Sequence, residues 1–427
     1  MPDFPEAISK AHANHLRPRC LCQPGASGIE MYVARLSDCY VIKRMPNTGW
    51  HHATDCTSYE LPADFSGLGP LVGSAIVENP VTGITELRLN FPMTKLPGRH
   101  VQPAACSASS SVTSNGQKLG LRALLHYLWD QAELTHWKPG FAGRRHWATV
   151  RRLLLQAAEN KVTRGQQLLD RLFVPEVFAF EQREAIQARR LQQWLHASAT
   201  SGRLQPLLLL IGEVKELVPC RYGYMVIIKH VPDQYFAIDE KFYRKICRAF
   251  ESELALWNMD LDAHMLMLAT FRVMNTGTPC IEELTLMPTT RQWIPFENIF
   301  EKQLLDALIN NQRAFTKGLR FNLQNPENIA SVVLLDTKRP PECLWIDTKM
   351  HPPAEGNAGS ALDRSGAASR PWAWRPAEGE MPPLPRSAKT HIAKQTNLPM
   401  NTPSEPASGK CQGTAEEHRG GNQSLAA

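Results

Sequence analysis

Hydrophobic runs in the first hundred residues have the composition of short strands. Met31–Leu36 and Tyr40–Met45 are rich in β-branched and aromatic residues and are separated by a short polar turn. A second candidate hairpin lies within Ser74–Lys95, around the turn-prone segment Asn79–Gly83. The N-terminal part of the chain is therefore predicted to contain two β-hairpins.

The hydrophobic period changes to that of α-helices in residues 118–178. The apolar face of a first helix is formed by Leu121, Leu124, Leu125, Leu128 and Ala132. His126 falls on the other arc of this helix and is expected at the surface. A second helix spans about residues 144–160. Its apolar side is formed by Trp147, Val150, Leu154 and Ala157.

Between about residues 203 and 348 the pattern becomes that of an α/β domain. The continuous apolar run Leu207–Ile211 is typical of a buried strand. Further strands are predicted at 224–229, 264–271, 281–287, 331–335 and 343–346, and helices at 241–257 and 300–315. Beyond Met350 the chain is rich in Pro, Ala, Gly and Ser, which predicts a largely disordered tail. The aromatic segment Pro371–Pro376 is expected to dock locally.

These elements predict a mixed α+β protein with several parts. The expected parts are a zinc-ribbon-like Cys/His hairpin (1–62), a β-hairpin with a Ser-rich linker (63–117), a basic helical region (118–202), an α/β domain that could be restriction-endonuclease-like (203–348), and the tail (349–427).

Cysteine and histidine residues flank the first hairpin on both sides. Cys20 and Cys22 precede it, and His52 and Cys56 follow it, so folding of the hairpin should bring the four side chains together. Structural zinc takes four such ligands in a closed tetrahedron. We predict a zinc site made of these residues, with His51 as an alternative to His52. Independent reduced thiols beside a surface histidine pair are the other interpretation.

The net charge of +6 is carried by one part of the chain. Residues 118–164 contain nine Lys or Arg against three Asp or Glu, a local excess that equals that of the whole chain. Four arginines are expected to cluster on one arc of the second helix and to contact phosphates: Arg144, Arg145, Arg151 and Arg152. A solvated arginine face without a partner fits the same pattern.

Composition limits the setting of the protein. No secretory signal is visible at the N-terminus, and the longest aliphatic run is far too short to cross a bilayer, so no membrane association is expected. Ten cysteines in 427 residues are too few for a disulfide scaffold. A reducing cytoplasm is therefore the expected location, where clustered cysteines tend to bind metal or react.

One set of acidic residues has the outline of a nuclease. Glu301 lies on a predicted helix, Asp336 ends a strand, and Asp347 and Lys349 end the next strand, as in the PD-(D/E)xK core. In such a site the carboxylates hold Mg²⁺ and the lysine assists the attacking water. The same short motif recurs at Asp336–Lys338 and at Glu213–Lys215, and acids at strand ends that face water fit equally well.

Several long motifs resemble the bacterial family catalogued as domain of unknown function 1173. They include RPRCLC (17–22), KRMPNTGWHHATDCTSYE (43–60), LRALLHYLWDQAELTHW (121–137), IGEVKEL (211–217) and WIPFENIFEKQLLDAL (293–308), and the similarity resumes at 374–385. The resemblance implies a setting in proteobacterial mobile elements and N-terminal cysteines, but it implies no activity.

Three functions remain open from the sequence. The first is a non-enzymatic, zinc-containing, nucleic-acid-associated protein of a mobile element. The second is a Mg²⁺-dependent nuclease of the PD-(D/E)xK type. The third is a protein–protein scaffold that binds other proteins of the element.

Overall fold

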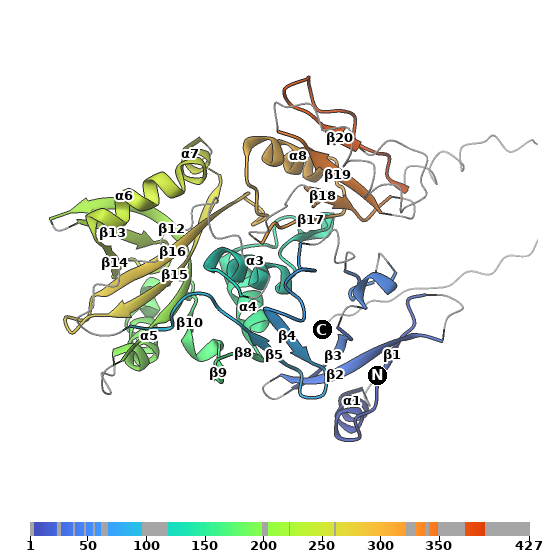
Figure 1. The fold of residues 1–427 in the computed structure, drawn as a ribbon, viewed down its shortest axis with the longest axis horizontal. Helices are drawn as coiled ribbons and strands as arrows, with labels where there is room; N and C mark the ends of the chain where they lie inside the picture. Colours follow the sequence, from blue (N-terminus) through green and yellow to red (C-terminus); the bar gives the residue numbers. More distant parts are fainter. Residues whose placement is uncertain are drawn as a thin grey trace, which may run out of the picture. The chain divides into compact units, whose positions relative to one another are not determined.

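A computed structural model describes most of the chain up to residue 388 (Figure 1). The described residues are 4–23, 27–36, 39–46, 48–53, 56–60, 67–95, 118–198, 204–221, 223–259, 262–321, 329–337, 341–348 and 372–388. They form a mixed α+β structure with several sheets. None of the helices within these ranges is both long and apolar enough to cross a membrane.

The N-terminal elements form a small antiparallel sheet with the order β1-β2-β3 (blue in Figure 1). They are α1 (Phe4–Ala13), β1 (Arg19–Cys20), β2 (Ile29–Leu36), β3 (Cys39–Arg44) and the 3-10 turn η1 (Gly49–His51). The first predicted hairpin is confirmed, and α1 contacts both of its strands. We call residues 4–60 the Cys/His module. Its apolar core is small because few of its side chains are fully buried.

The second predicted hairpin is also confirmed and joins a four-stranded sheet, β4-β5-β8-β9. The strands are β4 (Ile76–Asn79), β5 (Ile84–Leu87), β8 (Lys161–Thr163) and β9 (Gln166–Gln167). Gly83 has φ +70° in the β4–β5 turn, and a Cβ there would lie 3.0 Å from that of Ala34. The turn therefore needs glycine both for its backbone and for contact with the Cys/His module.

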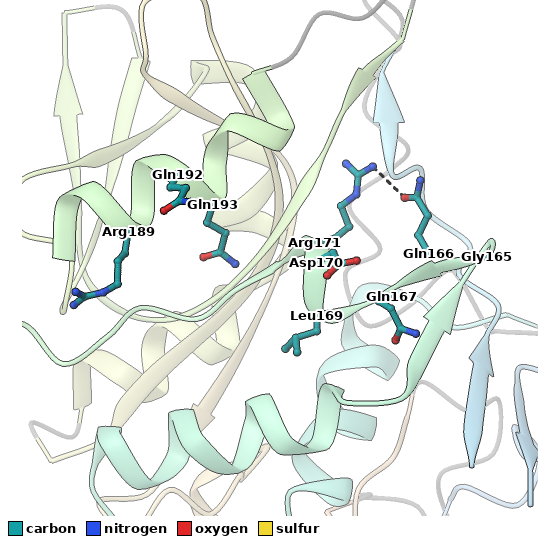
Figure 2. Close-up of a pocket in the computed structure, with 9 residues that line it drawn as sticks. All are labelled: Gly165, Gln166, Gln167, Leu169, Asp170, Arg171, Arg189, Gln192 and Gln193. Atoms are coloured by element: carbon teal, nitrogen blue, oxygen red, sulfur yellow. Dashed lines mark hydrogen bonds between the residues drawn. The ribbon is translucent and has the colours of Figure 1, made fainter. Parts of the chain in front are cut away.

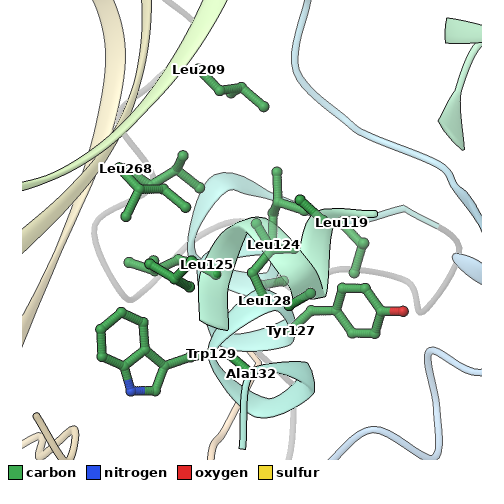
Figure 3. Close-up of a cluster of buried hydrophobic side chains, with 14 of the residues drawn as sticks. Leu119, Leu124, Leu125, Tyr127, Leu128, Trp129, Ala132, Leu209 and Leu268 are labelled. Atoms are coloured by element: carbon green, nitrogen blue, oxygen red, sulfur yellow. The ribbon is translucent and has the colours of Figure 1, made fainter. Parts of the chain in front are cut away.

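Helices α3 (Leu121–Gln131) and α4 (Trp147–Ala158) build the largest apolar cluster (Figure 3). The predicted leucine face of α3 is buried, and it packs on Leu209 and Leu268 of two long strands. The prediction for His126 was wrong. This residue is buried because α3 is covered on nearly all sides, and its Nδ1 accepts a hydrogen bond from the Phe321 N–H at 3.3 Å.

Residues 132–206 contain a long helix, α5, and several short elements besides α4. They are β7 (His136–Trp137), η2 (Pro139–Phe141), η3 (Leu169–Arg171), β10 (Leu172–Phe173), η4 (Phe180–Gln182), α5 (Arg183–Ser198) and β11 (Gln205–Pro206), which pairs with β6 (Thr94–Lys95). The second predicted helix starts only at Trp147, with His146 as its N-cap. Arg144 and Arg145 therefore precede α4.

Five strands close into a barrel. They are β12 (Leu208–Cys220), β13 (Gly223–Ile228), β14 (Tyr235–Ile238), β15 (His264–Val273) and β16 (Pro279–Thr289). Neighbours around the ring are β12-β13-β14-β16-β15, and β15 pairs again with β12. All of these pairs are antiparallel except β14–β16, which is parallel. The long strand β12 pairs with β15 through its first half and with β13 through its second half, and a bulge between Val214 and Glu216 bends it between the two.

Aromatic residues fill the barrel interior. Phe236 and Phe271 pack against each other, and Trp194 of α5 packs edge-on against both rings. Helix α6 (Glu240–Ala249) adds Phe242 and Ile246 to the same cluster. The predicted single helix at 241–257 is in fact two, since α7 (Glu251–Met259) begins after a break at Phe250.

The last sheet combines strands that are far apart in sequence. Its order is β20-β19-β18-β17-β7, with β17 (Phe315–Lys317), β18 (Val332–Leu334), β19 (Glu342–Ile346) and β20 (Trp372–Trp374). Helix α8 (Ile299–Asn310) supplies leucines to the same core. The expectation that the aromatic segment of the tail docks is confirmed for β20, which runs parallel to β19.

Candidate metal centre

Four side chains meet beside the N-terminal sheet. Cys20 ends β1 and Cys22 follows two residues later, whereas His52 and Cys56 follow η1. Their ligand atoms all lie within 4.8 Å of one another. The predicted ligand set is therefore brought together, and the cause is local: β1 pairs with β2, β2 pairs with β3, and η1 turns the chain back.

The distances between the ligand atoms suit a tetrahedral ion. The Sγ atoms of Cys20 and Cys56 are 3.7 Å apart, and His52 Nδ1 lies 3.5 Å from Cys22 Sγ and 3.8 Å from Cys56 Sγ. Zinc–sulfur bonds of about 2.3 Å and zinc–nitrogen bonds of about 2.0–2.1 Å give tetrahedron edges of roughly 3.8 Å between sulfurs and 3.6 Å from sulfur to nitrogen. The four residues therefore fit a zinc ion.

Backbone amides also point at the sulfurs. The Ala53 N–H donates to Cys22 Sγ at 3.3 Å, and the Ser58 N–H donates to Cys56 Sγ at 3.4 Å. Such bonds stabilise thiolates and orient metal ligands. Burial lowers the pKa of His52, with further contributions from nearby Arg44 and His51, and this shift favours the neutral imidazole that metal binding requires.

The structure distinguishes between the two neighbouring histidines. His52 is 2% exposed and faces the sulfurs, whereas His51 is exposed and stacks on Trp50 with ring centroids 3.7 Å apart. Trp50 is itself 52% exposed, and Leu21, between the two cysteines of the Cys-x-Cys pair, is 78% exposed. Exposed side chains thus lie next to the candidate ligands in sequence: Leu21 between Cys20 and Cys22, and Trp50 and His51 before His52.

The four predicted phosphate-binding arginines have different environments. Arg145 donates to the carbonyls of Leu134 and Gln292 at 3.1 and 3.4 Å, and also to those of Glu133 and His136. Burial lowers its pKa to about 10. Arg145 therefore stabilises backbone carbonyls rather than being free to bind a phosphate.

The other three arginines lie closer to solvent. Arg151 is half-buried, and its Nε donates to the Val174 carbonyl at 3.1 Å. Arg144 and Arg152 are exposed, and Arg152 donates to Gln156 Oε1 at 3.3 Å. The expected single arc of four arginines does not form, because two of them precede α4 and do not follow its helical period.

The three acids of the nuclease outline each have a basic partner. Glu301 is buried and accepts a hydrogen bond from Lys317 Nζ at 3.1 Å. Arg313 donates two hydrogen bonds of 2.8 Å to the Asp336 carboxylate. Asp347 lies 3.6 Å from Arg375. Among the described residues the three carboxylates do not form a group that could share a metal ion. Lys349 lies outside the described residues.

The rival motif at Glu213 leads to a cluster that the sequence did not reveal. Glu213 is buried, and its Oε1 accepts bonds of 2.7 Å from both Lys229 Nζ and His264 Nδ1. Burial alone would raise the pKa of Glu213, but these two hydrogen bonds outweigh it and hold the pKa below its usual value. The ring of His264 stacks on buried Trp293 at 3.9 Å. Only the tertiary fold unites these residues.

A polar groove of about 840 Å³ lies beside α5 (Figure 2). It is lined by Gly165, Gln166, Gln167, Leu169, Asp170, Arg171, Arg189, Gln192 and Gln193. Arg171 donates to Gln166 Oε1 at 3.0 Å, and Arg189 bonds Glu176 at 2.7 and 3.0 Å. Each of its two guanidinium groups thus has a side-chain oxygen as a partner.

Comparison with known proteins supplies a family. No curated protein and no solved structure matches the chain. The family model described as "Protein of unknown function (DUF1173)" matches residues 1–377. This range contains the Cys/His ligands, the barrel and β20. The chain therefore belongs to the DUF1173 family.

Proposed function

We propose that this chain is a non-enzymatic, zinc-containing protein that binds nucleic acid, as the sequence had led us to expect. The observation that carries the proposal is the four-ligand centre flanked by the exposed Trp50–His51 stack. A setting in a bacterial mobile element is an expectation of the family resemblance and completes this proposal.

Zinc in this centre has a structural role. Three cysteines and one histidine fill a tetrahedral shell, whereas a catalytic zinc keeps one position open for water or substrate. When bound, the ion cross-links the segments on either side of the hairpin. It thereby restrains Leu21, which lies between Cys20 and Cys22, and Trp50, which lies two residues before His52.

The surroundings of the centre suit nucleic acid. An exposed tryptophan stacked on an imidazole offers a flat surface on which an unpaired base can stack. Arg17 and Arg19 are about half exposed and share one carboxylate, Glu30, at 3.1 and 3.7 Å. One positive charge in this trio is therefore unbalanced and available to a phosphate. Exposed Arg144 and Arg152 add further sites for phosphate contact.

The test combines metal analysis with binding. Elemental analysis of the purified chain should give about one zinc per chain. Fluorescence anisotropy with a labelled single-stranded oligonucleotide should show binding that Trp50→Ala weakens by roughly 5- to 150-fold, the usual range for one stacked base. Phe180→Ala, at an aromatic residue 66% exposed elsewhere, is the matched control and should leave binding unchanged.

Two outcomes would contradict this proposal. The first is the absence of zinc, and the second is the absence of binding to any oligonucleotide at low salt. The nuclease hypothesis is tested in the same samples, because it requires Mg²⁺-dependent cleavage that Asp347→Ala abolishes. The scaffold hypothesis predicts zinc content without any binding of nucleic acid.

A further inference from the structure

The connectivity of the barrel is informative by itself. Numbered along the chain, its strands occur around the ring in the order 1-2-3-5-4-1, and α6 and α7 lie between the third and fourth strands. The third and fifth strands are parallel. This is the arrangement of the five-stranded barrels that bind oligonucleotides or oligosaccharides on the face of strands 2 and 3. Connectivity alone does not assign a ligand, so the chemistry of that face must decide.

One side of the barrel is already covered. Outward residues of β12, β15 and β16 belong to the large cluster around α3: Leu209, Ile211, Leu266, Leu268 and Met287. Figure 3 shows Leu209 and Leu268 beside α3. A ligand therefore has no access to this side. The inward residues of the same strands, such as Leu208 and Leu210, belong to the aromatic core.

The opposite side has a different character. In the register of β12, β13 and β14, Glu216 pairs with Ile227, and Ile227 pairs with Tyr235. In the next outward row, Val218 pairs with Met225, and Met225 pairs with Ala237. We call these six residues the β13–β14 face. None of its apolar members belongs to a hydrophobic cluster of the described residues.

The solvent exposure of these residues also indicates that the β13–β14 face is uncovered. Tyr235 is 45% exposed, and Met225 and Ile227 are half-buried although they lie in the middle of a sheet. Inward neighbours on the same strands, Val226 and Phe236, are completely buried. The face is thus an apolar platform with one aromatic ring, and it is not covered by any residue that the structure describes.

Basic groups lie around the platform. Lys215, the bulge residue of β12, has a side chain 61% exposed and lies 3.7 Å from Glu216 of the face. Lys229, which follows β13, has a side chain 50% exposed and is bonded to Glu213 at 2.7 Å. Arg221, in the β12–β13 turn, is also exposed. Glu216 is the carboxylate of the face itself. Other carboxylates of the described barrel segment are Glu213 of β12, Asp233 in the β13–β14 turn, Asp239 at the N-cap of α6, Asp262 before β15, and Glu240, Glu251, Glu253, Glu282 and Glu283 of α6, α7 and β16. Asp233 lies two residues before Tyr235, and Arg190 binds its carboxylate at 2.8 and 2.5 Å.

We propose that the β13–β14 face binds single-stranded nucleic acid, with a base stacked on Tyr235 and phosphates near Lys215 and Arg221. This inference rests on the proposed function and names its substrate class, because only unpaired bases can expose their faces to an aromatic ring. A duplex hides its bases and offers only phosphates. The face is a second contact, separate in sequence from the Trp50–His51 stack.

The test uses the full-length chain and two outward residues of the barrel. Tyr235→Ala should weaken binding of a labelled single-stranded oligonucleotide by roughly tenfold, within the range for one stacked base. Ile227→Asp places a negative charge beside the bound oligonucleotide and should weaken its binding at least as much. Thermal melting should stay close to wild type for both, because neither side chain belongs to the core. Phe180→Ala is again the control.

Salt dependence provides a second readout. Lys215→Gln should flatten the slope of log affinity against log salt by roughly 0.7, the value for one phosphate contact on a single strand. Affinity for duplex DNA should change little in Tyr235→Ala, whereas a protein-binding face would leave the affinities for single and double strands equally unaffected.

The outcomes separate the two proposals. Unchanged single-strand affinity in both barrel variants, together with loss in Trp50→Ala, overturns the barrel site and leaves the proposed function standing. Weaker single-strand binding in the barrel variants and in Trp50→Ala supports both proposals. A wild-type chain that binds no oligonucleotide overturns both.

Discussion

The Cys/His module and the barrel reach stability by different means. In the module, the sheet β1-β2-β3 has a small apolar core, and four ligand side chains gather at one end. In the barrel, Phe236, Phe271 and Trp194 are at most 1% exposed, and α6 adds further apolar side chains. A short segment buries little surface to offset its conformational entropy, and the proposed zinc ion would add the stabilisation that the small core lacks.

This difference predicts separate responses to separate perturbations. If the module binds zinc as proposed, the binding free energy stabilises its folded state, whereas apolar burial stabilises the barrel. Removing one kind of stabilisation should leave the other region folded. Each of the following tests is a way to break or sharpen that contrast.

The largest effect is expected from metal removal. Structural zinc contributes about 10–16 kcal/mol in zinc-finger peptides, far more than a small sheet can replace. Chelation, or Cys56→Ser, should therefore raise amide hydrogen exchange throughout residues 17–60 while β12 and β15 stay protected. Cys220→Ser changes an exposed cysteine away from the cluster and is the control. Protection of the module that survives complete metal loss would contradict the contrast.

Truncation inside the barrel should have the opposite pattern. Phe236→Ala removes a fully buried ring that contacts Trp194 and Phe271, which should lower the free energy of unfolding by about 3–5 kcal/mol. Urea unfolding measures the loss, and the zinc content should remain that of the wild type. Tyr235→Ala, the outward neighbour on β14, should cost much less. Zinc loss in Phe236→Ala would show that the two regions unfold together.

A smaller effect is expected in the segment between the two regions. Arg145→Ala leaves several backbone carbonyls without their donor and should destabilise the chain by roughly 2 kcal/mol. Arg144→Ala, at the exposed neighbour, should leave the free energy of unfolding unchanged. Its effect should appear instead in nucleic-acid affinity at low salt. Equal stability of the two variants would argue against a structural role for Arg145.

The smallest effect concerns pH and the edge of the barrel. The pKa of Glu213 is lowered in the folded chain, so its stabilising contribution is present above its ordinary value of 4.5 and is lost as pH falls below it. Glu213→Gln should lose on the order of 1 kcal/mol at neutral pH, and its stability should fall less than that of wild type as pH drops below 4.5. Parallel pH profiles for wild type and variant would exclude this contribution.

Sequence patterns predicted the local elements well. The hairpin of β2 and β3, helix α3 and the strands β15 and β16 follow from runs of residues that carry their own signal. The ligand set of the metal centre was also within reach, because a hairpin necessarily brings its two flanks together. Even the break after Ala249 changed only the length of a predicted helix, not its existence.

Contacts between distant residues were beyond this kind of reasoning. Arg145 looked like a phosphate ligand, but the carbonyls that bind it lie at the end of α3 and beyond β16. Asp336 was predicted to bind a metal ion, but its carboxylate accepts two hydrogen bonds from Arg313. Residue type and spacing do not show which opposite charge the fold brings near, and this pairing decides whether a charged group is available to a ligand.

What the sequence determined by itself was therefore the two N-terminal hairpins, the apolar faces of α3 and α4, most strands of the barrel, and the Cys/His set around the first hairpin. Tertiary structure alone decided that β12 pairs with β15 to close a barrel, that His52 rather than His51 faces the sulfurs, and that β20 joins β19 from the tail. The physical reason is the distance along the chain over which each kind of signal acts. Periodicity and turn chemistry act over a few residues, whereas strand partners and ion pairs are selected by packing across the whole chain.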